Sequence, residues 1–142
     1  MKTIQILCLI IVLGVLGCDS SKQKTEQQQF NQYITILGIA QDAGYPQIDC
    51  EKECCKAYLE GKEKKKLVSC IGLVDLNTKQ KWLFDATPDI NKQTQILKDQ
   101  HLDHQKVIDG VFLTHAHIGH YTGLMHFGRE ALGAKAIPVY AM

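Results

Sequence analysis

The sequence predicts a mixed α/β domain, in which helices pack on a sheet that has both antiparallel and parallel strand pairs. The apolar segments at residues 68–76 and 82–84 are joined by a short turn, which is typical of antiparallel neighbours. Later strand-like segments are separated by helix-like ones, which is typical of parallel neighbours. The 142 residues, with 45% hydrophobic and 22% charged residues and a net charge of +1, fit one globular domain and favour neither nucleic-acid binding nor disorder.

Alternation and β-branched residues predict the strands. We expect them at residues 33–39, 68–76, 82–84, 111–114 and 137–140. Residues 41–50 contain Gly44 and Pro46 and are predicted to form a loop. The first helix should run from Pro88 to about residue 100 with Thr87 as its N-cap, and the second from 122 to 132. His101, at the end of the first helix, is expected to face solvent.

The N-terminal residues are predicted to lie outside the fold. An apolar segment at residues 4–16 is shorter than a membrane-spanning helix of ~20 residues and is typical of a signal peptide. It ends at Cys18 in a pattern that resembles a bacterial lipoprotein signal, so we expect a signal peptide at 1–17 and lipidation of Cys18. A polar tether should occupy the rest of 18–32, before a domain at 33–142. This predicts a protein held on a membrane in the bacterial cell envelope, facing the periplasm or the exterior; a plain secretory signal or an uncleaved anchor is the alternative.

A histidine cluster is the clearest functional signal. His115, His117 and His120 follow a predicted strand directly. In an extended segment, residues i and i+2 share a face, and the turn after it can bring the third imidazole to the same space. Three neutral imidazoles suit Zn²⁺, although iron, manganese and copper are also compatible. The alternative is three unrelated surface histidines near a turn.

These residues carry a resemblance to a known family. Residues 114–124 resemble the Thr-His-x-His-x-Asp-His-x-x-Gly-Leu signature of the metallo-β-lactamase superfamily, and residues 83–87 resemble the strand and aspartate turn before it. Residues 37–47, with cysteines following, are similar to the branch of pyrroloquinoline quinone biosynthesis protein B. The resemblance implies an αββα sandwich, of which residues 33–142 are the N-terminal half. It also implies hydrolysis of a small ester, thioester, amide or phosphodiester by a metal-activated water.

The resemblance also assigns metal ligands. His115 and His117 would bind a first metal and His120 a second, with one or two zinc ions expected. The family's aspartate would bind the second metal and orient the attacking hydroxide, but this chain has Gly119 there. Asp42 is one candidate replacement, and the alternative is that it structures its loop as an Asx-turn.

Asp85 is expected to support the metal ligands without binding metal itself. It would accept a hydrogen bond from a ligand histidine or from a backbone amide of the motif loop. A simple cap at the end of its strand is the alternative.

The cysteines indicate a second site. Cys50, Cys54 and Cys55 have a spacing compatible with thiolate ligation of a structural zinc, which the resembled branch also implies, with a further ligand from its second half. Disulfide bonding is the alternative, because a secreted lipoprotein lies in an oxidising compartment. Cys70, within an apolar strand, is expected to be a buried small side chain.

The superfamily domain is longer than this chain. We therefore expect a fragment, with a missing C-terminal half or a second chain needed to complete the fold, and with one apolar sheet face left uncovered. Three hypotheses follow: a metal-dependent hydrolase, a non-catalytic lipoprotein that binds a metal or small ligand, and an inactive truncated remnant.

Overall fold

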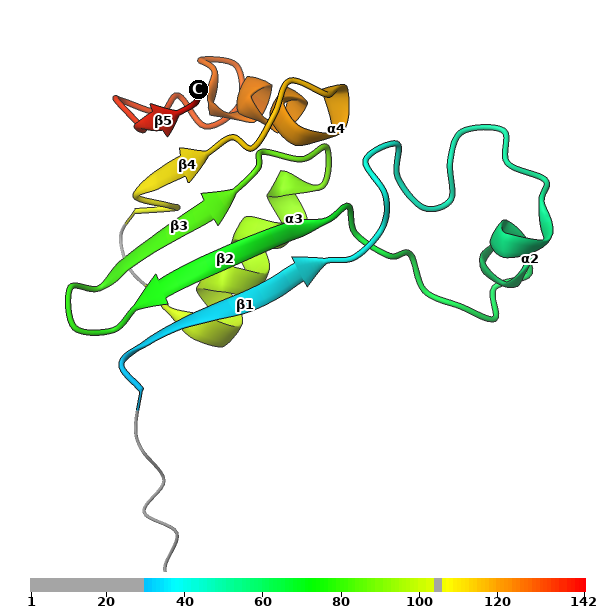
Figure 1. The fold of residues 1–142 in the computed structure, drawn as a ribbon, viewed down its shortest axis with the longest axis horizontal. Helices are drawn as coiled ribbons and strands as arrows, with labels where there is room; N and C mark the ends of the chain where they lie inside the picture. Colours follow the sequence, from blue (N-terminus) through cyan, green and yellow to red (C-terminus); the bar gives the residue numbers. More distant parts are fainter. Residues whose placement is uncertain (1–29, 104–105) are drawn as a thin grey trace, which may run out of the picture.

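The computed structural model describes residues 30–103 and 106–142, which form one five-stranded mixed sheet covered on one face by helices (Figure 1). The strands lie in chain order: β1 (Gln32–Gly38), β2 (Cys70–Asp75), β3 (Gln80–Phe84), β4 (Gly110–Phe112) and β5 (Val139–Tyr140). β1, β2 and β3 pair antiparallel, whereas β3, β4 and β5 pair parallel. The predicted mixed α/β sheet is confirmed. The signal peptide and Cys18 lie outside the described residues, and Gln32, assigned to the tether, begins β1.

The helical segments are short. They are α2 (Glu53–Leu59), α3 (Ile90–Ile96), a π-helical turn η1 (Leu97–His101), α4 (Ile118–Tyr121) and a 3₁₀ segment η2 (Thr122–Phe127). The first predicted helix begins at Ile90, two residues after Pro88, although the Thr87 hydroxyl still accepts a hydrogen bond from the Asp89 amide at 3.1 Å. Within the described residues, no helix is long and apolar enough to cross a membrane.

The second predicted helix is wrong in position and kind. An α-helix at 122–132 is replaced by α4, which begins earlier, followed by η2 and a series of turns. The reason is the close packing of Gly123, whose amide donates to the Ala86 carbonyl at 2.9 Å. A Cβ at Gly123 would overlap the backbone of Ala86 and Thr87, so the chain is held against the turn after β3.

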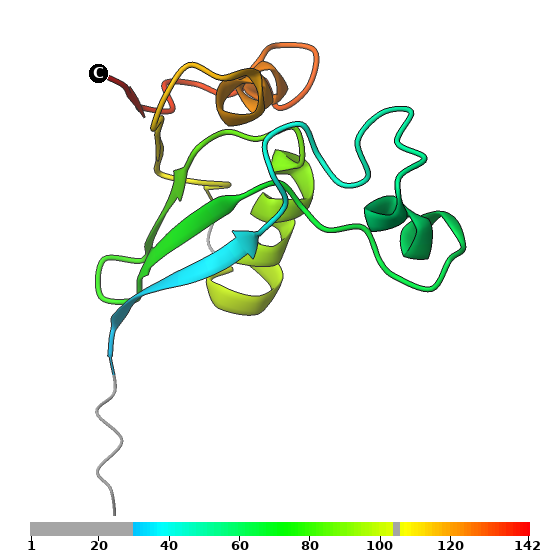
Figure 2. The ribbon, with the colours of Figure 1, turned by 45° about the vertical axis from the view of Figure 1, so that its right-hand side comes forward.

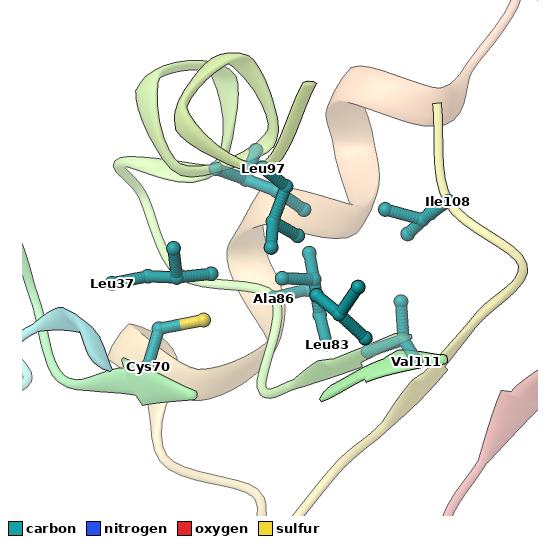
Figure 3. Packing of buried hydrophobic residues seen from close by; sticks show 9 residues of the cluster. Leu37, Cys70, Leu83, Ala86, Leu97, Ile108 and Val111 are labelled. Carbon is teal, nitrogen blue, oxygen red and sulfur yellow. The ribbon is translucent and has the colours of Figure 1, made fainter. Parts of the chain in front are cut away.

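The core lies between the sheet and α3 with η1. Side chains that alternate along β1 to β4 point to this face, and Leu97 of the helical layer faces them (Figure 3). The buried set comprises Leu37, Cys70, Val74, Leu83, Ala86, Ile90, Leu97, Ile108 and Val111. Burial, followed by the nearby Asp85 carboxylate, raises the pKa of the Cys70 thiol to about 12. Cys70 is thus a buried, protonated core side chain, as the sequence indicated.

His101 packs against β1, and the prediction that it faces solvent is wrong. Its Nδ1 lies 3.2 Å from the Tyr33 hydroxyl and its Nε2 lies 3.2 Å from the Thr35 hydroxyl. The π-helical turn at the end of the helix brings this ring onto the sheet instead of out into water.

The opposite face of the sheet is apolar and open. Ile34 and Ile36 of β1 are 66% and 70% exposed. Beside them runs an aromatic row made of Trp82, Phe84, Phe112 and Tyr140, in which Phe112 stacks on Phe84 at 5.2 Å and on Tyr140 at 4.8 Å between ring centroids. In both views α3 lies on the other side of the sheet (Figures 1 and 2). The described part of the chain therefore leaves this face uncovered, as expected for half of a sandwich.

Candidate metal centre

The candidate site residues gather at the carboxyl ends of the parallel pair β3 and β4. Phe84, the last residue of β3, pairs with Phe112, the last residue of β4. Asp85 follows directly after β3, while Thr114 and the histidine cluster follow β4. Because parallel strands end at the same sheet edge, this register brings side chains far apart in sequence together. The candidate metal ligands thus lie at one edge of the sheet, where β3 and β4 end.

The Asp85 carboxylate joins the two strand ends. It is 6% exposed and accepts hydrogen bonds from the Thr114 amide at 2.8 Å and from the Thr114 hydroxyl at 2.9 Å. Its second oxygen accepts a hydrogen bond from Nδ1 of His120 at 2.7 Å. Asp85 therefore contacts both a histidine and a backbone amide of the motif. Its backbone φ of 73° is one that an aspartate tolerates better than most residues do.

These hydrogen bonds orient two imidazoles. In a neutral His120, donation from Nδ1 to Asp85 leaves Nε2 as the unprotonated atom. The Thr114 hydroxyl donates its proton to Asp85 and therefore accepts from Nδ1 of His115, at 2.9 Å. The Nε2 atom of His115 is then also unprotonated. Both tautomers are assigned from the hydrogen-bond network for neutral rings. Nε2 of His115 then accepts a hydrogen bond from Nδ1 of His117, which a bound metal would replace.

The three rings lie close together at the sheet edge. The His115 ring centroid is 4.0 Å from that of His120 and 4.6 Å from that of His117. Nε2 of His115 and Nδ1 of His117 are 3.0 Å apart. Two nitrogens bound to one tetrahedral zinc lie about 3.3–3.4 Å apart, given metal–nitrogen bonds of about 2.0–2.1 Å. The His115–His117 pair therefore fits a shared metal with small adjustments, and His120 lies beside it.

The sequence reasoning missed the role of Thr114. This residue was part of the motif, but its hydroxyl is what connects Asp85 to His115. The clue in the sequence was a hydroxyl-bearing residue directly before the first histidine.

Gly119 and Asp42 also lie together. Gly119 is buried in α4, and the loop after β1 packs against it. A Cβ built on Gly119 would lie 2.5 Å from the Asp42 Cβ, and nearer still to the Asp42 carbonyl oxygen. Both views place this loop beside α4 (Figures 1 and 2).

The cysteine cluster is a separate candidate site, on the segment around α2 that extends past the C-terminal end of β1 (Figure 1). Possible ligand atoms of Cys50, Cys54 and Cys55 all lie within 4.8 Å of one another. Cys50 and Cys55 form a disulfide, and Cys54 is an exposed free thiol whose Sγ is 3.9 Å from that of Cys55. The three sulfur atoms are close enough to form a disulfide when oxidised and to bind a metal when reduced. Both predictions from the sequence, a structural zinc site and a disulfide, are therefore compatible with this geometry.

A hollow of about 800 Å³ lies elsewhere, between α3, η1 and η2. Asn91, Lys98 and His126 are among the residues that line it, and the three clustered histidines are not. The candidate metal centre therefore rests on the proximity of the imidazoles and not on this hollow.

Known proteins resemble this chain over its histidine-bearing part. A family model described as a β-lactamase superfamily domain matches residues 80–142, from β3 through the whole histidine cluster to β5. Over these residues the chain is similar to the metallo-β-lactamase superfamily. It is also 32% identical over 99 residues to a coenzyme PQQ synthesis protein B from Pseudomonas entomophila, covering 66% of this chain and 32% of that protein.

Solved structures agree on the superfamily fold. The Zn²⁺-bound PqqB of Methylobacterium extorquens matches with a TM-score of 0.60 at 22% identity, over 77% of this chain and 48% of that one. A diphosphatase of the PhnP family matches with a TM-score of 0.54 at 24% identity, over 78% of this chain and 41% of that one. The chain thus spans about a third of the curated relative and under half of each solved structure.

The orienting role of Asp85 predicts a specific defect. Asp85→Asn keeps the size and tolerates the positive φ, but its amide has one accepting oxygen where the carboxylate has two, so it cannot accept from both Thr114 and His120. We expect affinity for Zn²⁺ to fall about 10- to 100-fold, measured by competition with a chromophoric chelator. Asp75→Asn is the control, since the Asp75 carboxylate caps the β2–β3 turn through Asn77 and Thr78. Equal affinities for the two variants would contradict the assignment.

The cysteine cluster makes a second prediction. In the reduced chain, the three thiols should bind Co²⁺ and give a thiolate-to-metal charge-transfer band. Cys54→Ser should weaken this band strongly. Cys70→Ala should leave it intact, because the Cys70 thiol is buried in the core. If the reduced protein shows no such band, the metal-site prediction is wrong, and Cys50 and Cys55 serve only to form their disulfide.

Proposed function

We propose that the protein is a metal-dependent hydrolase that cleaves a small ester, thioester or phosphodiester. The observation that carries the proposal is the Asp85–Thr114–His115 hydrogen-bond chain together with the Asp85–His120 bond. It leaves two Nε2 atoms unprotonated at the edge of the sheet. Such fixed, neutral imidazoles are what a divalent metal requires of its ligands.

Each residue has a distinct task in this proposal. His115 and His117 bind the first metal and His120 the second, while Asp85 holds the rings in their orientation through Thr114 and His120. A bound Zn²⁺ supplies the nucleophile by lowering the pKa of its water to about 7. His115 and His117 are exposed, so a substrate reaches the site from solvent. Ile118 and Tyr121 on α4 are also exposed and give the site an apolar margin.

The relatives support hydrolysis and metal binding in general terms. One fold neighbour is a diphosphatase and another binds Zn²⁺. Because the chain spans less than half of these proteins, further ligands and the substrate pocket are part of the proposal. We propose that a second sheet, from a C-terminal half or from another chain, covers the open apolar face and supplies them.

Gly119 favours a second candidate function. At this motif position the family has a carboxylate, and this chain has no side chain. A protein that binds a metal or a small ligand without turning it over would retain the histidines and dispense with that carboxylate.

His115→Ala tests the function. We expect metal affinity to fall more than about 100-fold and turnover of bis(4-nitrophenyl) phosphate or of a thioester panel to be lost with it, because a ligand is removed. His126→Ala is the control, since His126 lies on η2 and contacts Asn91. Unchanged metal content in His115→Ala would refute the ligand assignment. Stoichiometric metal in the wild type without turnover of any substrate class would favour the binding protein.

We also propose that Cys18 is lipidated and holds the protein on a membrane of the cell envelope. The support is the apolar segment that ends in Gly17-Cys18, followed by a polar stretch. Two or more acyl chains anchor a protein stably, at roughly 0.8 kcal/mol per buried methylene. Cys18→Ser should abolish incorporation of labelled palmitate and release the protein from the membrane fraction, whereas Cys8→Ser should not. Labelling that persists in Cys18→Ser would refute the anchor.

A further inference from the structure

The loop that carries Asp42 packs directly against Gly119 of α4, and the metal site proposed above gives this contact no role. The side chain of Asp42 starts 2.5 Å from the point where a side chain at residue 119 would start. A carboxylate attached to Asp42 therefore begins at nearly the same place as one attached to residue 119. The two positions cannot both carry side chains, because any Cβ at Gly119 would overlap the Asp42 backbone. In this chain the backbone and Cβ of Asp42 occupy the space where a side chain at residue 119 would lie.

The position of Asp42 is fixed by neighbouring residues. The chain before it is anchored where the Ile39 and Ala40 amides donate to the Leu67 carbonyl, each at 2.9 Å. The turn itself is closed by Gln41, whose carbonyl accepts from the Gly44 amide at 2.9 Å and whose side chain contacts Ala43 and Gly44. Gly44 has a φ of 92°, which glycine adopts without strain.

The hydrogen bonds that hold this turn thus come from Gln41, and not from Asp42 as an Asx-turn would require. An Asx-turn would use the Asp42 carboxylate to hold the amide two residues on, whereas the Gly44 amide donates to the Gln41 carbonyl instead. Among the described residues, the turn's side-chain hydrogen bonds come from Gln41. Asp42 is half-buried. The side-chain hydrogen bonds found among the described residues do not involve its carboxylate.

We propose that Asp42 supplies, from the β1 loop, the carboxylate that Gly119 cannot, and that it binds the second divalent metal together with His120. This inference rests on the proposed function and completes its second metal position. Asp85 is engaged by Thr114 and His120 and serves to orient them, so the two aspartates have different tasks. Gly119 is then required, because only glycine leaves room for the loop that carries the carboxylate.

Two kinds of substitution separate a ligand from a packing contact. Asp42→Asn keeps the shape of the side chain and removes its charge, so it impairs metal binding only if the carboxylate is a ligand. Gly119→Ala keeps the carboxylate and displaces its loop. Asp49→Asn is the matched control: Asp49 lies on the same loop, is exposed, and has a φ of 54° that asparagine tolerates well.

The experiment is a titration of the full chain with Zn²⁺ and with Co²⁺, monitored by calorimetry and by the Co²⁺ absorption spectrum. Relative to Asp49→Asn, we expect Asp42→Asn and Gly119→Ala each to weaken the second metal's binding about 10- to 100-fold. The double variant should be no weaker than the worse single one, because both act on the same carboxylate. Circular dichroism and thermal melting establish that each variant is folded.

Two results would overturn the inference. One is an Asp42→Asn chain that is folded and binds both metals as Asp49→Asn does; the other is a wild-type chain that binds one metal at the histidines. The outcome is separable from that of the proposed function. If His115→Ala loses metal while Asp42→Asn does not, the metal centre stands and Asp42 is only a packing residue. If neither loses metal, the metal centre itself is wrong.

Discussion

The Asp85 carboxylate is the interaction on which the arrangement of this site depends. It connects the end of β3 to the end of β4 and to α4, so one buried charge fixes three segments. Hydrogen bonds to a charged group contribute about 1.5–3 kcal/mol each, whereas a non-glycine residue at positive φ costs on the order of 1–3 kcal/mol. The bonds from Thr114 and His120 therefore offset the backbone conformation of Asp85. Without this carboxylate, no hydrogen bond would join the ends of β3 and β4 through Asp85, and none would fix the tautomers of His115 and His120.

The sequence predicted what local patterns determine. Alternating apolar residues gave the strands, and the short turn at 77–79 and the later helical segments gave the mixed pairing. Helix predictions failed where tertiary contacts override propensity. Residues 122–132 contain enough apolar residues for an α-helix, but the contact of Gly123 with Ala86 forces a 3₁₀ path. The prediction that His101 faces solvent failed for the same reason. The π-helical turn at the end of the helix directs its imidazole ring toward Tyr33 and Thr35 of β1.

The clustering of the three histidines was predictable from the sequence, whereas the contacts that support them were less so. The spacing of His115, His117 and His120 carries chemical information by itself, since they lie on one strand end and the turn after it. The proximity of Asp42 to Gly119 depends on how a loop anchored at Leu67 packs against α4, which no local pattern encodes. α4 contacts Asp42 through Gly119, and η2 contacts Ala86 and Thr87 through Gly123. Both glycines are therefore explained by close approach of another backbone.

The aromatic row on the open sheet face has a practical consequence. The chain contains one tryptophan, and Trp82 stands in that row, 5.7 Å from Phe112 between ring centroids. Its ring also covers Gly110, where a Cβ would collide with it. Indole emission shifts with the polarity around the ring. The indole emission of these 142 residues therefore reports on a single surface, and its wavelength distinguishes a sheet face in contact with water from one buried in a completed sandwich.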